Sequence, residues 1–207
     1  MSAGTLVLWR HGQTAYNAAQ RLQGQVDIEL NSAGIDQAER AAAELVKLGP
    51  TRIIASDLRR ATRTAQALGD LARIGIEPEP RLRERSFGLW EGLTNEEIRT
   101  GWPDAHTAWR RGEEPADIGA EPRDAVARRV AAAVGETAES MAPDDVLVVV
   151  AHGAAHTLGL TRLLGLDPTQ WFGLSGLDNC RWSLLAPNPG RLPTWRLTAH
   201  NLGVPGT

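Results

Sequence analysis

The chain has 207 residues, of which 42% are hydrophobic, which is enough to bury the core of one domain. Its formal net charge of −3 at pH 7 gives no broad basic excess, which excludes a surface that neutralises nucleic acid phosphates. The single cysteine, Cys180, excludes an intramolecular disulfide and a cysteine-based metal site. The sequence shows no secretory signal and no apolar run of membrane-spanning length, so we expect a cytoplasmic protein without a membrane partner.

Strand and helix signals alternate through the first part of the chain, a pattern that predicts a parallel sheet covered by helices. Prolines at 78 and 80 confine the last of these strands to a sheet edge. In chain order the predicted elements are a strand at 5–9, a helix at 31–49, a strand at 52–56, a helix at 57–72 and a strand near 75–79.

The second part of the chain opens with an irregular segment rich in Gly, Pro, Trp and charge. We expect residues of about 85–124 to form an insertion with short helices that acts as a lid on a single domain of residues 1–207. The elements predicted after it are a helix at 122–141, a buried strand at 145–153, a helix at 155–164 and antiparallel strands at 180–186 and 194–201. Together these elements predict an α/β three-layer sandwich, with a mostly parallel central sheet flanked by helices.

Two of the predicted strands end in a histidine followed by glycine, "RHG" at 10–12 and "AHG" at 151–153. Ligands of open α/β sheets bind at the carboxyl ends of the strands, and glycine there lets a ligand approach the backbone closely. A structural histidine is the safer interpretation of either tripeptide alone. The repetition at two strand ends indicates a site that contains His11 and His152.

Two further segments contribute charged side chains to the predicted site. Arg59 and Arg60 follow the strand at 52–56, and Glu84 precedes the insertion. Guanidinium groups bind phosphate oxygens bidentately, an imidazole can form a covalent intermediate, and a carboxylic acid can protonate a leaving alcohol. Nearby cations are expected to lower the pKa of His11 and keep it neutral and nucleophilic. The set therefore predicts a phosphoryl-transfer pocket.

The order of these motifs resembles the histidine phosphatase (phosphoglycerate mutase-like) superfamily, in its branch 1. The resemblance extends over nearly the whole chain. It is carried by "RHGQT" at 10–14, "SDLRRATRTA" at 56–65, "LRERSFGLWEGLT" at 82–94, "VVVAHG" at 148–153, and Asn17, Arg21, Gln23, Gly24, Asp27, Leu30 and Gly34.

The resemblance implies a role for each matching residue. His11 would be the phosphorylated nucleophile, and Glu84 the proton donor that later serves as base for the attacking water. His152 would be the second pocket histidine. The phosphate would be held by Arg10, Arg60, His152 and Asn17, and the substrate side would be lined by Gln23 and Gly24.

Several residues keep two interpretations. Arg110, Arg111 and Arg123 are candidates for binding a substrate carboxylate or second anion, and solvated surface charge is the alternative. Asn179 lies in a predicted turn, with substrate contact as its alternative. The pair His152 and His156 has the spacing of metal ligands on a helix, but no third ligand is evident and His152 is assigned to phosphate. We therefore expect no metal and no cofactor.

Three functions fit such a site. The mutases of the superfamily carry "ERHYG" with a substrate-contacting tyrosine, whereas this chain has "ERSFG", so Phe87 and Ser86 favour a phosphatase over a phosphoglycerate mutase. The segment after Trp109 is also short for a mutase lid. A non-catalytic phospholigand-binding relative, or a regulatory phosphoprotein phosphatase, is the alternative of another class, which the complete residue set and the insertion disfavour.

The expected substrate is a small phosphorylated metabolite of the sugar-phosphate or glycerate-phosphate type. The late residues Leu174, Gly176, Asn179 and Trp182, together with the motif around Glu84, resemble glucosyl-3-phosphoglycerate phosphatases. The oligomeric state is open, with a homodimer as one expectation.

Overall fold

The structure is a computed structural model that describes residues 2–204. Its strands are β1 (Thr5–Arg10), β2 (Arg52–Ala55), β3 (Ile76–Pro78), β4 (Val146–Ala151), β5 (Trp182–Pro187) and β6 (Trp195–Leu202). Its α-helices are α1 (Ala15–Ala18), α2 (Ser32–Leu45), α3 (Arg59–Ala72), α4 (Asn95–Gly101), α5 (Pro103–Arg110), α6 (Arg123–Glu139) and α7 (Gly153–Leu163). The 3-10 helices are η1 (Val46–Leu48), η2 (Pro80–Leu82) and η3 (Gly88–Trp90).

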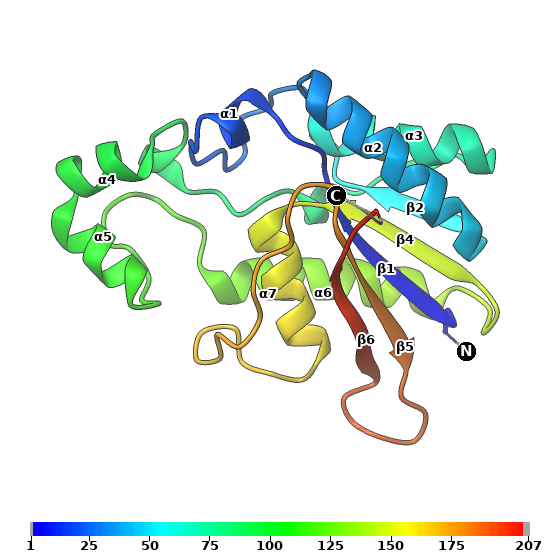
Figure 1. The fold of residues 1–207 in the computed structure, drawn as a ribbon. Helices are drawn as coiled ribbons and strands as arrows, with labels where there is room; N and C mark the ends of the chain where they lie inside the picture. The colour runs from blue at the N-terminus through cyan, green and yellow to red at the C-terminus, as the bar shows by residue number, and fades with distance from the viewer. Residues whose placement is uncertain (1, 205–207) are drawn as a thin grey trace.

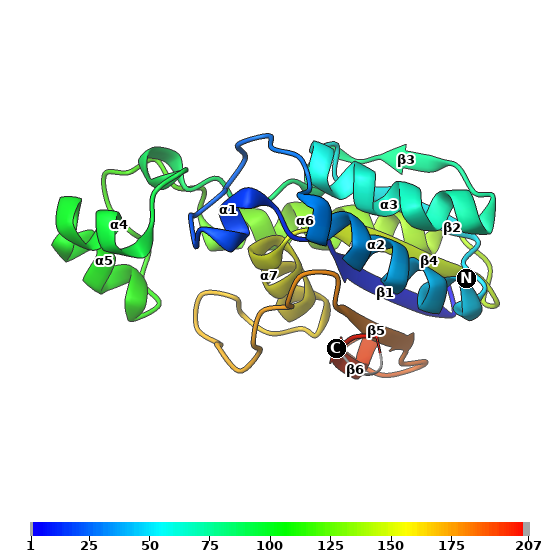
Figure 2. The same ribbon diagram turned by 45° about the horizontal axis from the view of Figure 1, so that its top comes forward.

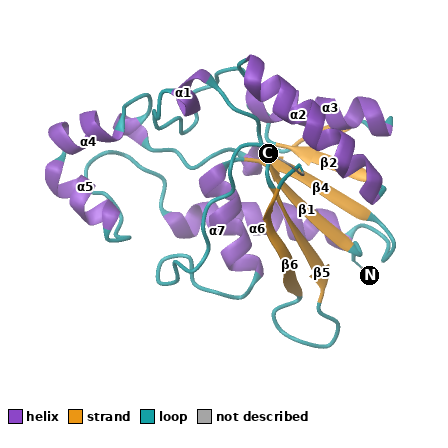
Figure 3. Cartoon of the chain, in the orientation of Figure 1, coloured by secondary structure: helices purple, strands orange, loops and turns teal. Residues whose placement is uncertain are grey.

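The strands form one 6-stranded sheet in the order β3-β2-β4-β1-β5-β6 (Figures 1 and 3). The pairs β2–β3, β2–β4 and β1–β4 are parallel, and β5 is antiparallel to both β1 and β6. The proline-containing β3 lies at one edge, where a missing backbone N–H breaks no ladder. The predicted α/β sheet, mostly parallel and flanked by helices, is confirmed.

Helices cover both faces of the sheet, which makes three layers (Figure 2). Side chains along a strand alternate between faces, so each central strand serves two cores. The core under α6 and α7 includes Leu6, Leu8, Leu147 and Val149. The core under α2 and α3 includes Val7, Trp9, Val148 and Val150. Burial on both faces explains why β1 and β4 are continuous apolar runs.

The 85–124 segment contains η3, α4 and α5 and has a small core of its own. Phe87, Trp90, Ile98 and Ile118 form this cluster, in which Trp90 meets Trp109 edge-on at 5.6 Å between ring centroids. In Figures 1 and 2, α4 and α5 lie to one side of the sheet, beyond α1 and α7. The short helices expected in this segment are therefore present.

Local signals fix the helix ends. Asn31 caps α2, with its side chain accepting a hydrogen bond from the Gly34 backbone N–H, and Gly49 ends η1 in the left-handed region at φ 67°. The sequence analysis did not predict the 4-residue helix α1, which begins with a capping box formed by Thr14 and Asn17. Within residues 2–204, no helix is both long and apolar enough to cross a membrane.

Candidate active site

The two histidines meet because their strands are neighbours. β1 and β4 pair in parallel with Arg10 opposite Ala151, so the residue after each strand emerges at the same edge of the sheet. The rings of His11 and His152 lie there with centroids 5.1 Å apart. The structure thus brings the two histidines together as the strand-end argument predicts.

His11 presents a single free ring nitrogen. Its Nδ1 lies 2.7 Å from the carbonyl oxygen of Gly12, which can only accept, so Nδ1 carries the proton and Nε2 keeps its lone pair. The side chain is buried, with 2% of its surface exposed. Burial, and then the charges of Arg10 and Arg60, hold the pKa of His11 well below its usual value of 6.5. The imidazole is therefore neutral at physiological pH.

Arg60 lies in the first turn of α3 and is fully buried. Its guanidinium donates to three acceptors: Nη2 to Gly24 O at 2.8 Å, Nη1 to Val26 O at 2.8 Å and Nε to His152 Nδ1 at 3.2 Å. Because Nδ1 accepts, the proton of His152 is on Nε2, which donates to Ser56 Oγ at 2.8 Å. Both nitrogens of His152 are thus bonded within the protein, so a bond to phosphate requires one of them to exchange partners.

Arg10 approaches the site from the end of β1. Its Nη1 donates to Leu177 O at 2.5 Å, while its Nε is buried without a partner within the described residues. A Cβ at Gly153 would lie 3.5 Å from the Arg10 Cζ, so the glycine of "AHG" leaves the guanidinium close to the start of α7. Burial lowers the pKa of both Arg10 and Arg60, and the nearby Glu84 charge raises it.

Glu84 is held against the N-terminus of α7. Its Oε1 accepts hydrogen bonds of 2.8 Å from the backbone N–H groups of Arg85 and Ala155, and its Oε2 accepts one of 3.1 Å from Ala154. These bonds fix the carboxylate beside the strand end that supplies His152. A carboxylate, an unprotonated imidazole nitrogen and two guanidiniums therefore share one site.

Asn17, Gln23 and Gly24 lie around the same site. Asn17 Oδ1 accepts from the Thr14 backbone N–H at 3.1 Å, so the Asn17 amide N–H groups can act as donors, and the Thr14 hydroxyl donates to Gln23 Oε1 at 3.0 Å. Gly24 has a φ of +50°, and a Cβ there would lie 2.1 Å from Glu91 Oε1. Glycine therefore suits this turn, whose carbonyl accepts from Arg60.

Not every candidate arginine reaches the site. Arg110 and Arg111 are exposed at the end of α5, where Arg111 pairs with Glu113 at 2.8 Å, and neither contacts the group around His11. Arg123 begins α6 and lines a cavity next to Glu84. The structure therefore places Arg123 at a cavity and the other two arginines on the surface, a difference that the sequence did not reveal.

Two contributing residues were not among those assigned to the site: Ser56 was given no role, and Asn179 was expected in a turn, with substrate contact as the alternative. Ser56 fixes the tautomer of His152, and its place directly after β2 is the signal that would have found it. Asn179 Nδ2 donates to His11 O at 3.0 Å and to Asn17 Oδ1 at 3.2 Å. The predicted turn at Asn179 thus joins the ends of two distant segments.

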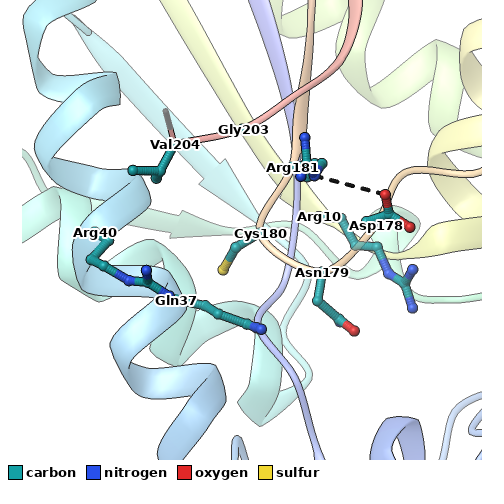
Figure 4. Close-up of a pocket in the computed structure, with 9 residues that line it drawn as sticks. All are labelled: Arg10, Gln37, Arg40, Asp178, Asn179, Cys180, Arg181, Gly203 and Val204. Carbon is teal, nitrogen blue, oxygen red and sulfur yellow. Dashed lines mark ion pairs between the residues drawn. The ribbon is translucent and has the colours of Figure 1, made fainter. Parts of the chain in front are cut away.

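A second cavity, of about 390 Å³, lies on the other side of Arg10. In Figure 4 its lining includes Arg40, Gln37 and Cys180, and the guanidinium of Arg10 points away from Arg40 and Gln37. Burial raises the pKa of the Cys180 thiol to about 12, so this cysteine does not supply a thiolate. Within residues 2–204, no group of three or more His, Cys, Asp or Glu side chains is arranged to hold a metal ion.

The mostly parallel sheet is covered by helices on both faces, and two histidines lie between arginines at its strand ends; this combination is typical of phosphoryl-transfer proteins. The chain belongs to the histidine phosphatase superfamily (branch 1), whose family model matches residues 6–202. It is similar to "Glucosyl-3-phosphoglycerate phosphatase" of Mycobacterium tuberculosis, with 39% identity over 218 residues that cover 97% of each chain. It is also similar to "Probable phosphoglycerate mutase GpmB" of Yersinia pestis, with 38% identity over 181 residues covering 85% of this chain and 81% of the relative.

Solved structures show the same fold. A mycobacterial glucosyl-3-phosphoglycerate phosphatase in complex with VO3 has a TM-score of 0.88 and 40% identity, covering 97% of this chain and 100% of that one. The phosphoserine phosphatase of Entamoeba histolytica in complex with 3-phosphoglyceric acid has a TM-score of 0.80 and 27% identity, covering 94% and 95%.

Proposed function

We propose that this protein is a metal-independent phosphatase that hydrolyses small phosphomonoesters through a phosphohistidine. The observation that carries this proposal is the state of His11: a buried, neutral imidazole whose unprotonated Nε2 faces a site flanked by Arg10 and Arg60. Such a nitrogen is nucleophilic, and the two guanidiniums supply the positive charge that a transferring phosphoryl group needs. The similarity to named phosphatases supports the same reaction class.

In the first step, His11 Nε2 attacks the phosphorus, and the bond from phosphorus to the ester oxygen breaks. Glu84, which is held at the start of α7 beside His152, enters this step as the protonated carboxylic acid and gives its proton to the leaving alkoxide. In the second step, water loses a proton to Glu84 as its oxygen attacks the phosphohistidine. Inorganic phosphate leaves, and both His11 and Glu84 return to their starting states.

Arg10, Arg60 and Asn17 are proposed to hold the phosphoryl oxygens. Phosphate would replace the present acceptors of the Arg60 guanidinium, or share its N–H groups, and the amide N–H groups of Asn17 would donate to it. His152 then has two tasks: it orients Arg60 now, and it bonds a phosphoryl oxygen once its Nδ1 is released. Gln23 and Gly24 shape the turn that faces the phosphate.

The substrate class we propose is a sugar-phosphate or glycerate-phosphate ester, with glucosyl-3-phosphoglycerate as the first candidate because of the relatives named for it. Phe87 supports hydrolysis over phosphoglycerate mutation, because it has no hydroxyl to bond a substrate and packs with its ring 5.3 Å from the Arg85 guanidinium carbon. Similarity to the Yersinia protein keeps the mutase as the second candidate.

Phosphate release from a panel of esters, assayed with and without a metal chelator, tests this function. The panel contains p-nitrophenyl phosphate, 3-phosphoglycerate and glucosyl-3-phosphoglycerate, with a parallel assay for 2-phosphoglycerate. Release that survives chelation supports the proposal. Formation of 2-phosphoglycerate without phosphate release would make the protein a mutase, and no turnover of any ester would favour a non-catalytic phospholigand-binding protein.

We also propose that residues 1–207 form a single domain in which the 85–124 segment acts as a lid. The enzyme works in the cytoplasm, and its partner is a small metabolite rather than nucleic acid. The proposed function is compatible with a homodimer. Limited proteolysis with and without substrate tests the lid, and light scattering gives the oligomeric state.

A further inference from the structure

A cavity of about 320 Å³ lies next to the residues that hold Glu84: Arg85 lines it, and the Arg85 backbone N–H donates to Glu84 Oε1 at 2.8 Å. Gly153 and Ala154 line it, and the backbone N–H of Ala154 is the group that holds Glu84 Oε2 at 3.1 Å. The other walls come from the 85–124 segment, α6, α7 and the segment at 168–176. A proton donor must touch the leaving oxygen, so the space next to Glu84 is where the alcohol part of an ester would lie.

The charge of Arg123 sets this cavity apart. Most arginines of residues 2–204 pair with a carboxylate. Those without such a pair are exposed, except for Arg10, Arg60 and Arg123. Two of the three belong to the phosphate site. A third half-buried, unneutralised guanidinium in the neighbouring cavity indicates a second position for a negative charge.

Arg123 is also held in place. Its Nη1 donates to Gly112 O, and its guanidinium carbon lies 5.2 Å from the ring centroid of Phe172. Arg85, which also lines the cavity, is different because its charge is already paired with Glu114 at 2.5 Å. Glu114 also accepts from the backbone N–H of Arg123 at 2.9 Å, but within residues 2–204 the Arg123 guanidinium itself makes no ion pair, so it is oriented and free to bind a carboxylate.

The walls around Arg123 are aromatic. Trp171 and Phe172 are 37% and 57% exposed, and Trp109 lines the same space. Phe172 also packs against the 85–124 segment, since a Cβ at Gly112 would lie 2.7 Å from its Cζ. Apolar walls with a few fixed polar groups are typical of a pocket that binds a small molecule and sets its orientation.

We propose that this cavity is the leaving-group subsite and that Arg123 binds a carboxylate on the alcohol part of the substrate. The inference rests on the proposed phosphatase function and restricts the range of its preferred substrates. The preferred substrates are phosphate esters of hydroxy acids, in which the phosphate lies between Arg10 and Arg60 and the carboxylate at Arg123. The aromatic walls cover the C–H surface of the same alcohol.

The test compares two esters that differ only in the carboxylate, 3-phosphoglycerate and glycerol 3-phosphate. For the natural chain we expect kcat/KM to be about 10- to 100-fold higher for 3-phosphoglycerate, the size of one charge-assisted interaction. Equal values for both esters would overturn the subsite while leaving the phosphatase intact. Hydrolysis of neither these esters nor p-nitrophenyl phosphate would instead reject the function on which the subsite rests.

Variants then assign the preference to Arg123. Arg123→Gln is expected to remove most of the ratio between the two esters, and Arg123→Lys, which keeps the charge, to retain part of it. Arg128→Gln is the matched control, because Arg128 lies on the same helix and pairs with Asp124 on the surface; its ratio should equal that of the natural chain. A ratio unchanged in folded Arg123→Gln, with thermal unfolding as the check of folding, would overturn the assignment.

Discussion

The proposed phosphate end and the proposed leaving-group end of the site are built differently. At the phosphate end, the side chains follow buried strands, and backbone carbonyls or buried side chains fix them: Arg60 makes three such bonds, and His11 is 2% exposed. At the leaving-group end, Arg123 and Phe172 come from a helix start and an irregular segment, and Phe172 is 57% exposed. If both proposals hold, the chemical step depends on side chains fixed at the sheet edge, whereas substrate choice depends on loop and helix-start residues, which can be substituted without disturbing the sheet.

Removal of the nucleophile should have the largest effect. His11→Ala is expected to lower kcat by roughly 10⁴-fold or more on every ester, because no other group can form the covalent intermediate. Rapid-quench trapping of phosphoenzyme from radiolabelled substrate measures the loss directly. Thermal unfolding of the variant serves as the control for folding. A labelled phosphoenzyme in His11→Ala would assign the nucleophile elsewhere.

Glu84 lies between the two ends, so its effect should depend on the leaving group. Glu84→Gln is expected to lower kcat/KM by about 10²- to 10⁴-fold for alkyl phosphates, which need a proton on the leaving oxygen. The loss for p-nitrophenyl phosphate should be far smaller, because nitrophenolate leaves without one. Steady-state kinetics on both esters checks this. Equal losses would remove Glu84 from the acid role.

The rigid end should also be the acid-sensitive one. His156 lies in its core, and its Nε2 is 3.0 Å from the carbonyl oxygen of Trp9. Burial lowers the pKa of His156 from 6.5 to about 4. Below pH 6.5 the unfolded chain therefore binds a proton that the folded chain does not, and the free energy of unfolding falls as the pH falls towards 4.

For this residue alone the loss between pH 6.5 and pH 5 is about 2 kcal/mol. His156→Gln keeps a donor for the Trp9 carbonyl and has no group that titrates in this range. Between pH 6.5 and pH 5, the free energy of unfolding of this variant should therefore fall by about 2 kcal/mol less than that of the natural chain. Urea unfolding of both chains at the two pH values measures the difference. The same pH-dependent loss in both would show that His156 does not contribute.

The smallest effects are expected at the exposed end of α5. Arg110→Ala and Arg111→Ala should change kcat/KM by less than about twofold and the free energy of unfolding by less than about 0.5 kcal/mol, as for surface ion pairs. Kinetics on 3-phosphoglycerate and denaturant titration test both values. A tenfold loss in either variant would mean that the 85–124 segment closes much further over the substrate than its position here.

The meeting of His11 and His152 at one sheet edge could be predicted from the sequence, whereas the lining of the cavity at Arg123 could not. Strand ends are visible as apolar runs followed by "RHG" and "AHG", and neighbouring parallel strands must place them together. The partners of these residues were less accessible: Ser56 and the Leu177 carbonyl reach the site through tertiary contacts that no local pattern encodes. Arg110, Arg111 and Arg123 looked equivalent because charge in a sequence does not reveal which arginine finds a carboxylate.

The pairing of β1 with late strands also sets when the site can form during synthesis. The Trp9 indole N–H donates to the Cys180 carbonyl, 171 positions further along the chain, and the Arg10 backbone N–H donates to Arg181 O. On the ribosome, the sheet around β1 therefore cannot be completed until nearly the whole chain has been synthesised. Such long-range pairing is slow, and it leaves apolar β1 exposed meanwhile. A nascent chain that ends before about residue 180 thus lacks the contacts that complete the sheet next to His11.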